Sequence, residues 1–362
     1  MKATSGEHFV ALDHVRAFAA YLVIVWHFNH GPIPFDYTPS LIPFALLDEG
    51  HTGVALFMTL SGYLFSKLLF RKSFDYAQFL KNRALRLLPL LVLAIVAGAM
   101  NLGSARRLLT YGYSVVKGAL LPTLPNGGWS VTVEAHFYLL LPILLALMKR
   151  SRLLLVAVLL IAIATRCAIY WYRGEVQLMA YWTIVGRIDQ FILGMLAFSF
   201  RTRLAARHAA VFATGCAFLT LYWVFDLHGG FFANGGDPSP GAAWIVLPTL
   251  EGLAYAIFIA WYDTSFSPRS TGTSGILAKA GQYSYSIYLL HFFFVFDAAK
   301  FINEHVSDLS NFYWASVWAL LFMFAMMPVG YLSYRFVEAP FLRLRRPYVT
   351  ADRHQFVSPI SS

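Results

Sequence analysis

Charged residues are scarce in this sequence. Only 13% of its 362 residues are Asp, Glu, Lys or Arg, whereas 58% are hydrophobic. Soluble domains carry about 25% charged residues, and a soluble fold of this size has too little interior to bury so much apolar surface. The composition therefore excludes an ordinary soluble domain and predicts a protein that lies in a lipid bilayer.

Cysteine is also rare. Cys167 and Cys216 both fall within apolar segments, so we expect small core residues rather than a disulfide framework or a metal site. His27 and His30 have a spacing that two metal ligands could use, but His30 comes at the end of its segment and no third ligand is evident. We therefore expect no bound metal.

Apolar segments long enough to cross a bilayer follow one another along the chain. A spanning helix needs roughly 20 mostly apolar residues. Ten segments meet this condition, at 10–29, 51–70, 86–103, 129–148, 152–171, 182–200, 209–227, 243–262, 282–300 and 311–337. We predict an all-α integral membrane protein, a bundle of about ten transmembrane helices. One transmembrane domain would cover residues 1–345, and residues 346–362 would form a short polar cytoplasmic tail.

Lys and Arg are unevenly distributed between alternate loops. If the N-terminus lies in the cytoplasm, 19 of them fall on the inner side and 5 on the outer side. Because positively charged loops stay in the cytoplasm, we predict that both termini lie there. The net charge of +10 is then mainly a signal of topology, and we expect no nucleic-acid partner.

The first apolar segment carries ionisable residues on one face. Arg16 and His27 are eleven residues apart, almost three whole turns, and Asp13 lies one turn before Arg16. Such residues in a membrane normally face the bundle interior or a wet cavity. Two interpretations of each stay open. Arg16 is either a cation at the membrane interface or a functional residue, and His27 is either a bonded core histidine or a general base.

Two further motifs lie in the second segment and in the predicted cytoplasmic connection after it. Ser61 and Gly62 are small residues inside the second segment, and they fit close helix packing as well as a gap for a substrate. Arg83 and Arg86 are three residues apart and share a helix face. They fit a cytoplasmic anchor, and they also fit a phosphate clamp, because paired guanidinium groups match phosphate oxygens.

The fourth segment opens with polar residues at helical spacing. Ser130, Glu134 and Tyr138 recur every four residues and share a face, and Trp129 before them is predicted to anchor the helix at the membrane interface. Glu134 lies about a turn and a half inside and needs a partner or a cavity. In the predicted topology it lies at a depth similar to that of His27 near the outer side, so a contact between the two is allowed.

Three later groups carry polar side chains. Arg187 and Asp189, near the outer end of the sixth segment, are predicted to form an ion pair within the bundle. His291 follows a run of Tyr and Ser in the ninth segment. Arg335 and Glu338 are three residues apart at the end of the tenth and are predicted to pair at the cytoplasmic surface.

Taken in order, these motifs resemble those of the membrane acyltransferase-3 family. The shared motifs are Leu-Asp followed by an Arg and a His eleven residues later, Leu-Ser-Gly-aromatic, Arg-x-x-Arg, Trp-Ser-x-x-x-Glu, Ser-Tyr-Ser-x-Tyr with its His, and Glu-x-Pro, within residues 10–342. The sequence departs from the family where His14 replaces a usual Gly. Ala135 and His136 also follow Glu134 where Glu-Gln is frequent, which leaves a single carboxylate there.

The resemblance implies a multi-pass enzyme of the bacterial inner membrane, without a fused C-terminal esterase-like domain. Such an enzyme transfers an acyl group, usually acetyl, from cytoplasmic acyl-CoA to a hydroxyl of a surface or exported polysaccharide or lipopolysaccharide. The resemblance gives His27 and Glu134 the catalytic role and gives Arg83, Arg86 and Arg16 the binding of acyl-CoA. The supporting residues would be Asp13, Ser61, Trp129, Ser130, Tyr138 and His291.

Partners follow from the same resemblance. We expect membrane lipids, the glycan acceptor and acyl-CoA, which is a co-substrate rather than a tightly bound cofactor. A homo-oligomer or partners in polysaccharide assembly are left open, as is the choice between His27 as general base and His27 as acyl carrier.

A non-enzymatic transporter or flippase for a glycan or lipid precursor is the alternative. The same ionisable residues would then line a polar path or a proton relay. Many transporters show inverted repeats with paired broken helices, and the sequence reveals none. Stabilisation of the protein by acyl-CoA against thermal unfolding would distinguish the enzyme from the transporter.

Overall fold

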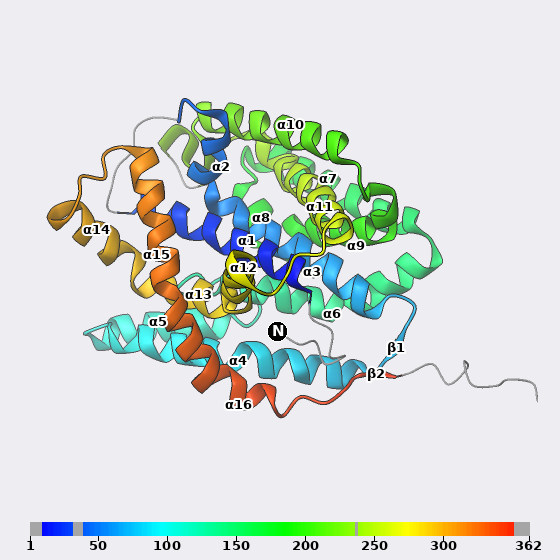
Figure 1. The fold of residues 1–362 in the computed structure, drawn as a ribbon, viewed down its shortest axis with the longest axis horizontal. Helices are drawn as coiled ribbons and strands as arrows, with labels where there is room; N and C mark the ends of the chain where they lie inside the picture. The colour runs from blue at the N-terminus through cyan, green and yellow to red at the C-terminus, as the bar shows by residue number, and fades with distance from the viewer. Residues whose placement is uncertain (1–8, 32–38, 236–237, 351–362) are drawn as a thin grey trace, which may run out of the picture.

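The computed structural model describes residues 9–31, 39–235 and 238–350. Helices pack around one another in one bundle, with α3 passing through its middle (Figure 1). The helices are α1 (Val10–Asn29), α2 (Ala45–Asp48), α3 (Gly53–Leu69), α4 (Tyr76–Met100), α5 (Ala105–Lys117), α6 (Trp129–Arg150), α7 (Arg152–Arg173), α8 (Gln177–Trp182), α9 (Ile184–Leu204), α10 (His208–Leu227), α11 (Leu247–Ser265), α12 (Gly272–Gln282), α13 (Ser284–Leu290), α14 (Val295–His305), α15 (Phe312–Ser333) and α16 (Ala339–Leu342). Short 3-10 helices are η1 (Ile42–Phe44), η2 (Gly50–Thr52), η3 (Gly230–Gly235), η4 (Ala242–Ile245) and η5 (His291–Phe293), and η6 (Tyr334–Glu338) is a π-helix. The two strands are β1 (Ser73–Phe74) and β2 (Val349–Thr350).

The long helices match the predicted apolar segments. Among the described residues, seven helices are long and apolar enough to cross a membrane, and the pair α13–η5 and α14, bent by 61°, makes an eighth candidate. The two other predicted segments are α9 and α11, which are 21 and 19 residues long but more polar. The all-α membrane fold is therefore confirmed, whereas the count of ten spans and the side on which the termini lie stay predictions.

Side-chain caps fix where several helices begin. The Asp75 carboxylate accepts the backbone N–H of Gln78 at 3.0 Å and starts α4, the helix that carries the Arg-x-x-Arg motif. Ser151 and Thr183 cap α7 and α9 in the same way. Gly174 ends α7 with a φ of 75°, a left-handed conformation that glycine adopts at little cost.

Close contact between α3 and α9 holds the centre of the bundle. A side chain at Gly62 would lie 2.0 Å from the carbonyl oxygen of Phe191, and one at Gly194 would lie 2.0 Å from that of Thr59. Only glycine permits backbones to approach so closely. Gly62 therefore serves helix packing, while its neighbour Ser61 faces a pocket described below.

Arg187 and Asp189 do not pair with each other. Asp189 binds Arg166 of α7 at 2.7 Å, and both side chains are fully buried. Arg187 donates instead to the backbone carbonyl of Tyr181 and, at 3.0 Å, to the side chain of Gln190. The predicted pair was wrong because residues two positions apart on a helix point in different directions.

The two cysteines were also placed wrongly. Cys167 on α7 and Cys216 on α10 are free and exposed rather than core residues. In the most apolar stretch of each of these helices, only 22% is buried inside the protein. The outer faces of α7 and α10 are therefore available to lipid, where a small polarizable side chain is tolerated.

The chain after α15 folds back along α4. Strand β2 pairs antiparallel with β1, and the ring of buried Tyr348 packs against Phe79 of α4 at 5.5 Å between centroids. Residue 345, the predicted boundary of the tail, does not coincide with a structural break, because packing continues through Tyr348. Residues 351–362 of the predicted tail lie outside the described residues.

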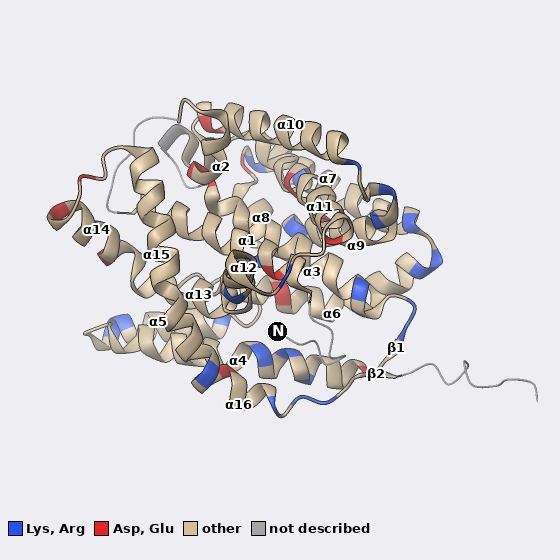
Figure 2. Ribbon diagram, viewed as in Figure 1, with Lys and Arg blue, Asp and Glu red and all other residues tan. Residues whose placement is uncertain are grey.

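Basic residues are gathered at one end of the bundle. Figure 2 shows many Lys and Arg toward the end where β1, β2 and the turn between α6 and α7 lie, and others on α5, whereas acidic residues show around α2 and α14. The asymmetry agrees with the sidedness predicted from the loops, which itself stays a prediction.

Candidate active site

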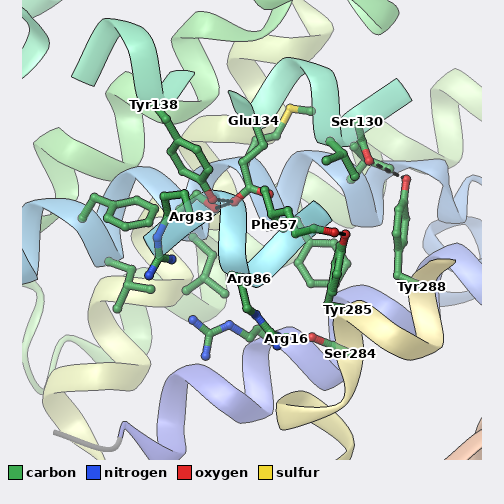
Figure 3. Close-up of a pocket in the computed structure, with 18 of the residues that line it drawn as sticks. Arg16, Phe57, Arg83, Arg86, Ser130, Glu134, Tyr138, Ser284, Tyr285 and Tyr288 are labelled. Atoms are coloured by element: carbon green, nitrogen blue, oxygen red, sulfur yellow. Dashed lines mark hydrogen bonds between the residues drawn. The ribbon is translucent and has the colours of Figure 1, made fainter. Parts of the chain in front are cut away.

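A pocket lies between α1, α3, α4, α6 and α13 (Figure 3). It contains about 1020 Å³ of space that no protein atom fills, part of it open to the surroundings. Seven of the eleven predicted site residues line it, namely Arg16, Ser61, Arg83, Arg86, Ser130, Glu134 and Tyr138. The other four, Asp13, His27, Trp129 and His291, lie outside the lining.

Glu134 forms part of the pocket wall and is fixed by two hydroxyl groups. Its carboxylate accepts a hydrogen bond from Ser61 at 3.1 Å and one from Tyr138 at 2.5 Å. No hydrogen bond joins Glu134 to His27 in the described part of the chain. The contact that the topology allowed is therefore not formed, and Glu134 does not orient His27.

Arg86 is paired with a carboxylate from the end of the chain. It forms an ion pair with Glu338 of η6, and Ser286 donates to the same carboxylate. Arg335, the predicted partner of Glu338, instead donates to the hydroxyl of Tyr331 at 2.7 Å. The predicted Arg335–Glu338 pair was wrong because the wider turn of the π-helix brings Glu338 inward, where it is 1% exposed.

Arg83 and Arg16 are held in different ways. The guanidinium of Arg83 lies over the rings of Phe65 and Phe79, 5.3 and 5.7 Å from their centroids, and its buried Nε has no hydrogen-bond partner. Aromatic faces stabilise the cation, and its side chain also interacts with the hydroxyl of Tyr138, so Nε is the group that stays available to an anion. Arg16 donates to buried Asp13 at 2.6 Å and lines the pocket, which disfavours a purely interfacial role.

His27 is paired with His291. Nδ1 of His27 lies 2.8 Å from the Val23 carbonyl oxygen and 3.3 Å from Nε2 of His291, while Nδ1 of His291 lies 2.6 Å from the Tyr288 carbonyl oxygen. A carbonyl oxygen only accepts, so these partners assign the proton of each neutral ring to Nδ1. Nε2 of His27 then carries a lone pair, and it has no hydrogen-bond partner among the described residues.

The histidine pair lies just beyond one end of the pocket. The ring of Tyr288, which lines the pocket, is 6.0 Å from the ring of His291. The hydroxyl of Tyr288 is 2.8 Å from that of Ser130 (Figure 3). Tyr288 therefore lines the pocket and also contacts His291, the partner of His27.

Trp129 is buried rather than anchored at a membrane interface. It is 6% exposed, and its ring packs against Trp182 of α8 at 4.5 Å and against Tyr181 at 5.1 Å. The prediction was wrong because α8 covers the start of α6, a packing that the sequence around Trp129 does not show.

Sequence reasoning gave no role to Tyr285 and Tyr288. Tyr285 donates to the Leu87 carbonyl at 2.6 Å, and its ring faces the guanidinium of Arg86 at 5.3 Å. The two tyrosines and His291 recur every three residues, a spacing that places them near one another on a helix face. That spacing was the signal that could have identified them.

Comparisons with known proteins agree with this geometry. A family model described as an acyltransferase domain matches residues 9–335. A Komagataeibacter xylinus protein named as a membrane-bound transacylase is 28% identical, over 51% of this chain and 50% of its own length. A Staphylococcus aureus (strain COL) protein named as an O-acetyltransferase is 24% identical, over 91% of this chain and 56% of its own length. The chain thus spans about half the length of the curated relatives it matches, and no solved structure matches it.

Proposed function

Since the chain belongs to the membrane acyltransferase-3 family, we propose that it is an O-acyltransferase of the bacterial inner membrane. The family and the names of the relatives make the protein a multi-pass membrane acyltransferase. Our proposal adds the donor, cytoplasmic acyl-CoA with acetyl as the first acyl group to test. It also adds the acceptor, a hydroxyl group of a surface or exported glycan.

The unbonded Nε2 of His27 carries the proposal. A neutral imidazole with a free lone pair is the side chain best suited to take a proton near neutral pH. His27 lies eleven residues along α1 from Arg16, and its partner His291 contacts Tyr288, which lines the pocket with Arg83 and Arg86. Cations in the pocket and a base next to it suit a donor with a phosphorylated end and a thioester end.

In the proposed transfer step, His27 acts as the general base. The acceptor hydroxyl gives its proton to Nε2 while its oxygen forms a bond with the thioester carbonyl carbon. The carbon–sulfur bond breaks, and the leaving thiolate takes the proton back from the imidazolium. The products are an O-acyl ester and the free thiol of coenzyme A, and His27 returns to its neutral form.

His291 and the Val23 carbonyl orient the base. Both accept from Nδ1–H of His27, the first at 3.3 Å and the second at 2.8 Å, and they favour the imidazolium that forms during the step. Glu134 has a separate task in this scheme. It holds the hydroxyl groups of Ser61 and Tyr138 in the wall along which the acyl arm would lie.

The test compares glycans from three strains. A deletion strain is complemented with the wild-type gene, with His27→Ala, or with His228→Ala, and surface glycans are examined by mass spectrometry for an acyl mass. His228 is a matched control because it is exposed and bonds its own i−4 carbonyl at 2.7 Å, as His27 does. Loss of a general base costs about 10²–10⁴ in rate, so we expect the acyl mass to disappear only with His27→Ala.

Purified protein separates the enzyme from a transporter. With acyl-CoA and acceptor glycan we expect release of thiol by the wild type and at least about hundredfold less by His27→Ala. Full activity of His27→Ala would exclude the scheme. If acyl-CoA neither reacts nor stabilises the wild type against thermal unfolding, the transporter becomes the better explanation.

A further inference from the structure

The segment between α16 and β2 is fixed alongside α4. The side-chain amide of Asn82 donates to the carbonyl of Arg346 at 2.7 Å, and the N–H of Arg346 donates back to Asn82 at 3.3 Å. Two residues later, the carbonyl of Tyr348 accepts from the N–H of Asp75 at 2.8 Å. Figure 1 shows this segment, in red, running along α4 to β2. Residues just before Arg346 are thereby positioned beside the Arg-x-x-Arg motif.

Arg345 is the residue so positioned. Burial, and then the guanidinium groups of Arg83 and Arg86, lower the pKa of Arg345 from its usual value. Its side chain donates from Nε to the Leu342 carbonyl at 3.2 Å. No other hydrogen bond of its guanidinium is found in the described part of the chain, so its terminal amino groups are available.

Only one of the three guanidinium groups here is paired with a carboxylate in the described part of the chain. Arg86 pairs with Glu338, whereas neither Arg83 nor Arg345 forms an ion pair within the described ranges. Neighbouring cations repel one another, and an anion that binds between them relieves the repulsion. Phosphate fits best, since its oxygens match the planar fork of a guanidinium and its charge can exceed one.

We propose that Arg345 joins Arg83 and Arg86 in a site for the phosphate groups of the donor. The inference rests on the proposed function, because it takes the nucleotide end of acyl-CoA as the source of those phosphates. Arg345 lies beyond residues 9–335, the range that the family model matches. The C-terminal segment thus supplies a specificity residue from outside the matched domain. A lipid headgroup carries the same phosphate chemistry and is distinguished by the test.

The test measures equilibrium binding to the full chain in nanodiscs of neutral phosphatidylcholine. The probes are coenzyme A, 3′-dephospho-coenzyme A, pantetheine and inorganic pyrophosphate. We expect Arg345→Ala to weaken coenzyme A about tenfold, as the loss of a charged hydrogen bond does, and to leave pantetheine unchanged. Arg343→Ala is the matched control, because Arg343 is exposed on the same segment and its loss removes the same charge. We expect it to stay within about twofold of wild type.

Several outcomes would overturn the inference. Equal weakening of coenzyme A and pantetheine in Arg345→Ala would mean that the residue holds the fold of the pocket rather than phosphate. Equal effects of Arg343→Ala and Arg345→Ala would mean a general effect of charge. If Arg345→Ala unfolds, Arg345→Lys provides the comparison. The lysine ammonium keeps the positive charge but lacks the planar, two-pronged set of donors that a guanidinium offers to phosphate. We therefore expect Arg345→Lys to lose less than tenfold in affinity for coenzyme A.

The remaining measurements distinguish failure of the proposed phosphate site from failure of the proposed donor. If the wild type binds pyrophosphate in an Arg345-dependent way but not coenzyme A, the phosphate site stands and the proposed donor fails. A second set of nanodiscs contains phosphatidylglycerol. A lipid-headgroup site would be saturated there, and the difference between wild type and Arg345→Ala in coenzyme A binding would vanish. Persistence of the difference assigns the site to the nucleotide phosphates.

Discussion

Two regions bury charged side chains inside the bundle, and they differ in how completely those side chains are bonded. Between α7, α9 and α11, the guanidinium of Arg166 donates to the carbonyls of Ile245 and Gly186 and to the side chains of Asp189 and Thr249, all at 2.6–2.7 Å. None of these residues lines the pocket. All three guanidinium nitrogens of Arg166 donate to groups within the protein. We call such a network closed, because none of these nitrogens is left without a partner for a ligand.

In and next to the pocket the arrangement is the opposite. Arg83 has a buried Nε without a partner and lies over aromatic rings beside empty space, and Nε2 of His27 is likewise unbonded in the described residues. An ionisable residue in a membrane is by default a candidate for function. The two regions show that burial alone does not identify a site, whereas incomplete hydrogen bonding beside a cavity does.

The strongest test of this comparison replaces one arginine in each region by methionine. Arg166→Met leaves Asp189 charged and buried, and breaking a buried pair in this way costs about 3–5 kcal/mol. We expect Tm in detergent to fall on the order of 10 °C. Arg83→Met removes a cation with no buried ion partner, so we expect a Tm near that of wild type but no stabilisation by acyl-CoA.

A double variant controls this experiment. Arg166→Met combined with Asp189→Leu removes both charges, and hydrophobic replacement of a buried pair is often neutral. We expect it to recover most of the lost Tm. If Arg83→Met lowered Tm as much as Arg166→Met, the two arginines would have the same structural task and the distinction between the regions would be lost.

His291 lies between the two cases, because both of its ring nitrogens have partners although it stands next to the pocket. His291→Phe removes one of two acceptors for Nδ1–H of His27 and leaves the Val23 carbonyl in place. The loss of one hydrogen bond is worth about 0.5–1.5 kcal/mol, so we expect kcat to fall up to about tenfold with an unchanged KM for the donor.

Rescue and pH dependence check the positioning role. The amide oxygen of Asn in His291→Asn can accept from His27, and we expect part of kcat to return together with the wild-type pH profile. A merely structural role for His291 would instead lower Tm and raise KM in both variants, with no rescue by Asn.

The spans and the pocket lining depend on local sequence, which is why much of both could be predicted. Hydropathy over about 20 residues locates a spanning helix, and helical spacing groups Ser130, Glu134 and Tyr138 on one face. All three line the pocket.

Partners across helices could not be predicted. Asp189 binds Arg166, 23 residues earlier, and Glu338 binds Arg86, 252 residues earlier. Local spacing favoured Arg335 as the partner of Glu338, but spacing assumes a regular α-helix and η6 is a π-helix. A helix that is apolar all round does not reveal which face turns toward which neighbour.

A third group of buried charges is centred on Asp48 and Glu49, which lie just before the candidate span Gly50–Leu69. The side chain of Asp48 shares a hydrogen bond with that of Asp226, and burial, followed by the charge of Asp226, raises the pKa of Asp48 to about 9. Glu49 accepts from the N–H of Phe231 at 3.1 Å and lies 2.9 Å from Nε2 of His51. Burial raises the pKa of Glu49 to about 7. The two aspartates are joined by their hydrogen bond only while a proton is shared between them.

The smallest expected effect is therefore a dependence of stability on pH. Folded Asp48 keeps its proton up to about pH 9, whereas an unfolded Asp loses it near 3.8. The native state thus binds more protons in this window, and stability falls as pH rises through it. We expect Tm to fall between about pH 5 and pH 9. Asp48→Asn should flatten the fall, because its amide donates to Asp226 without titrating. Glu304→Gln, at an exposed carboxylate of α14, should not flatten it.

A Tm that rises with pH, or an unchanged slope in Asp48→Asn, would mean that the two aspartates share no proton and that this group is as open as the pocket.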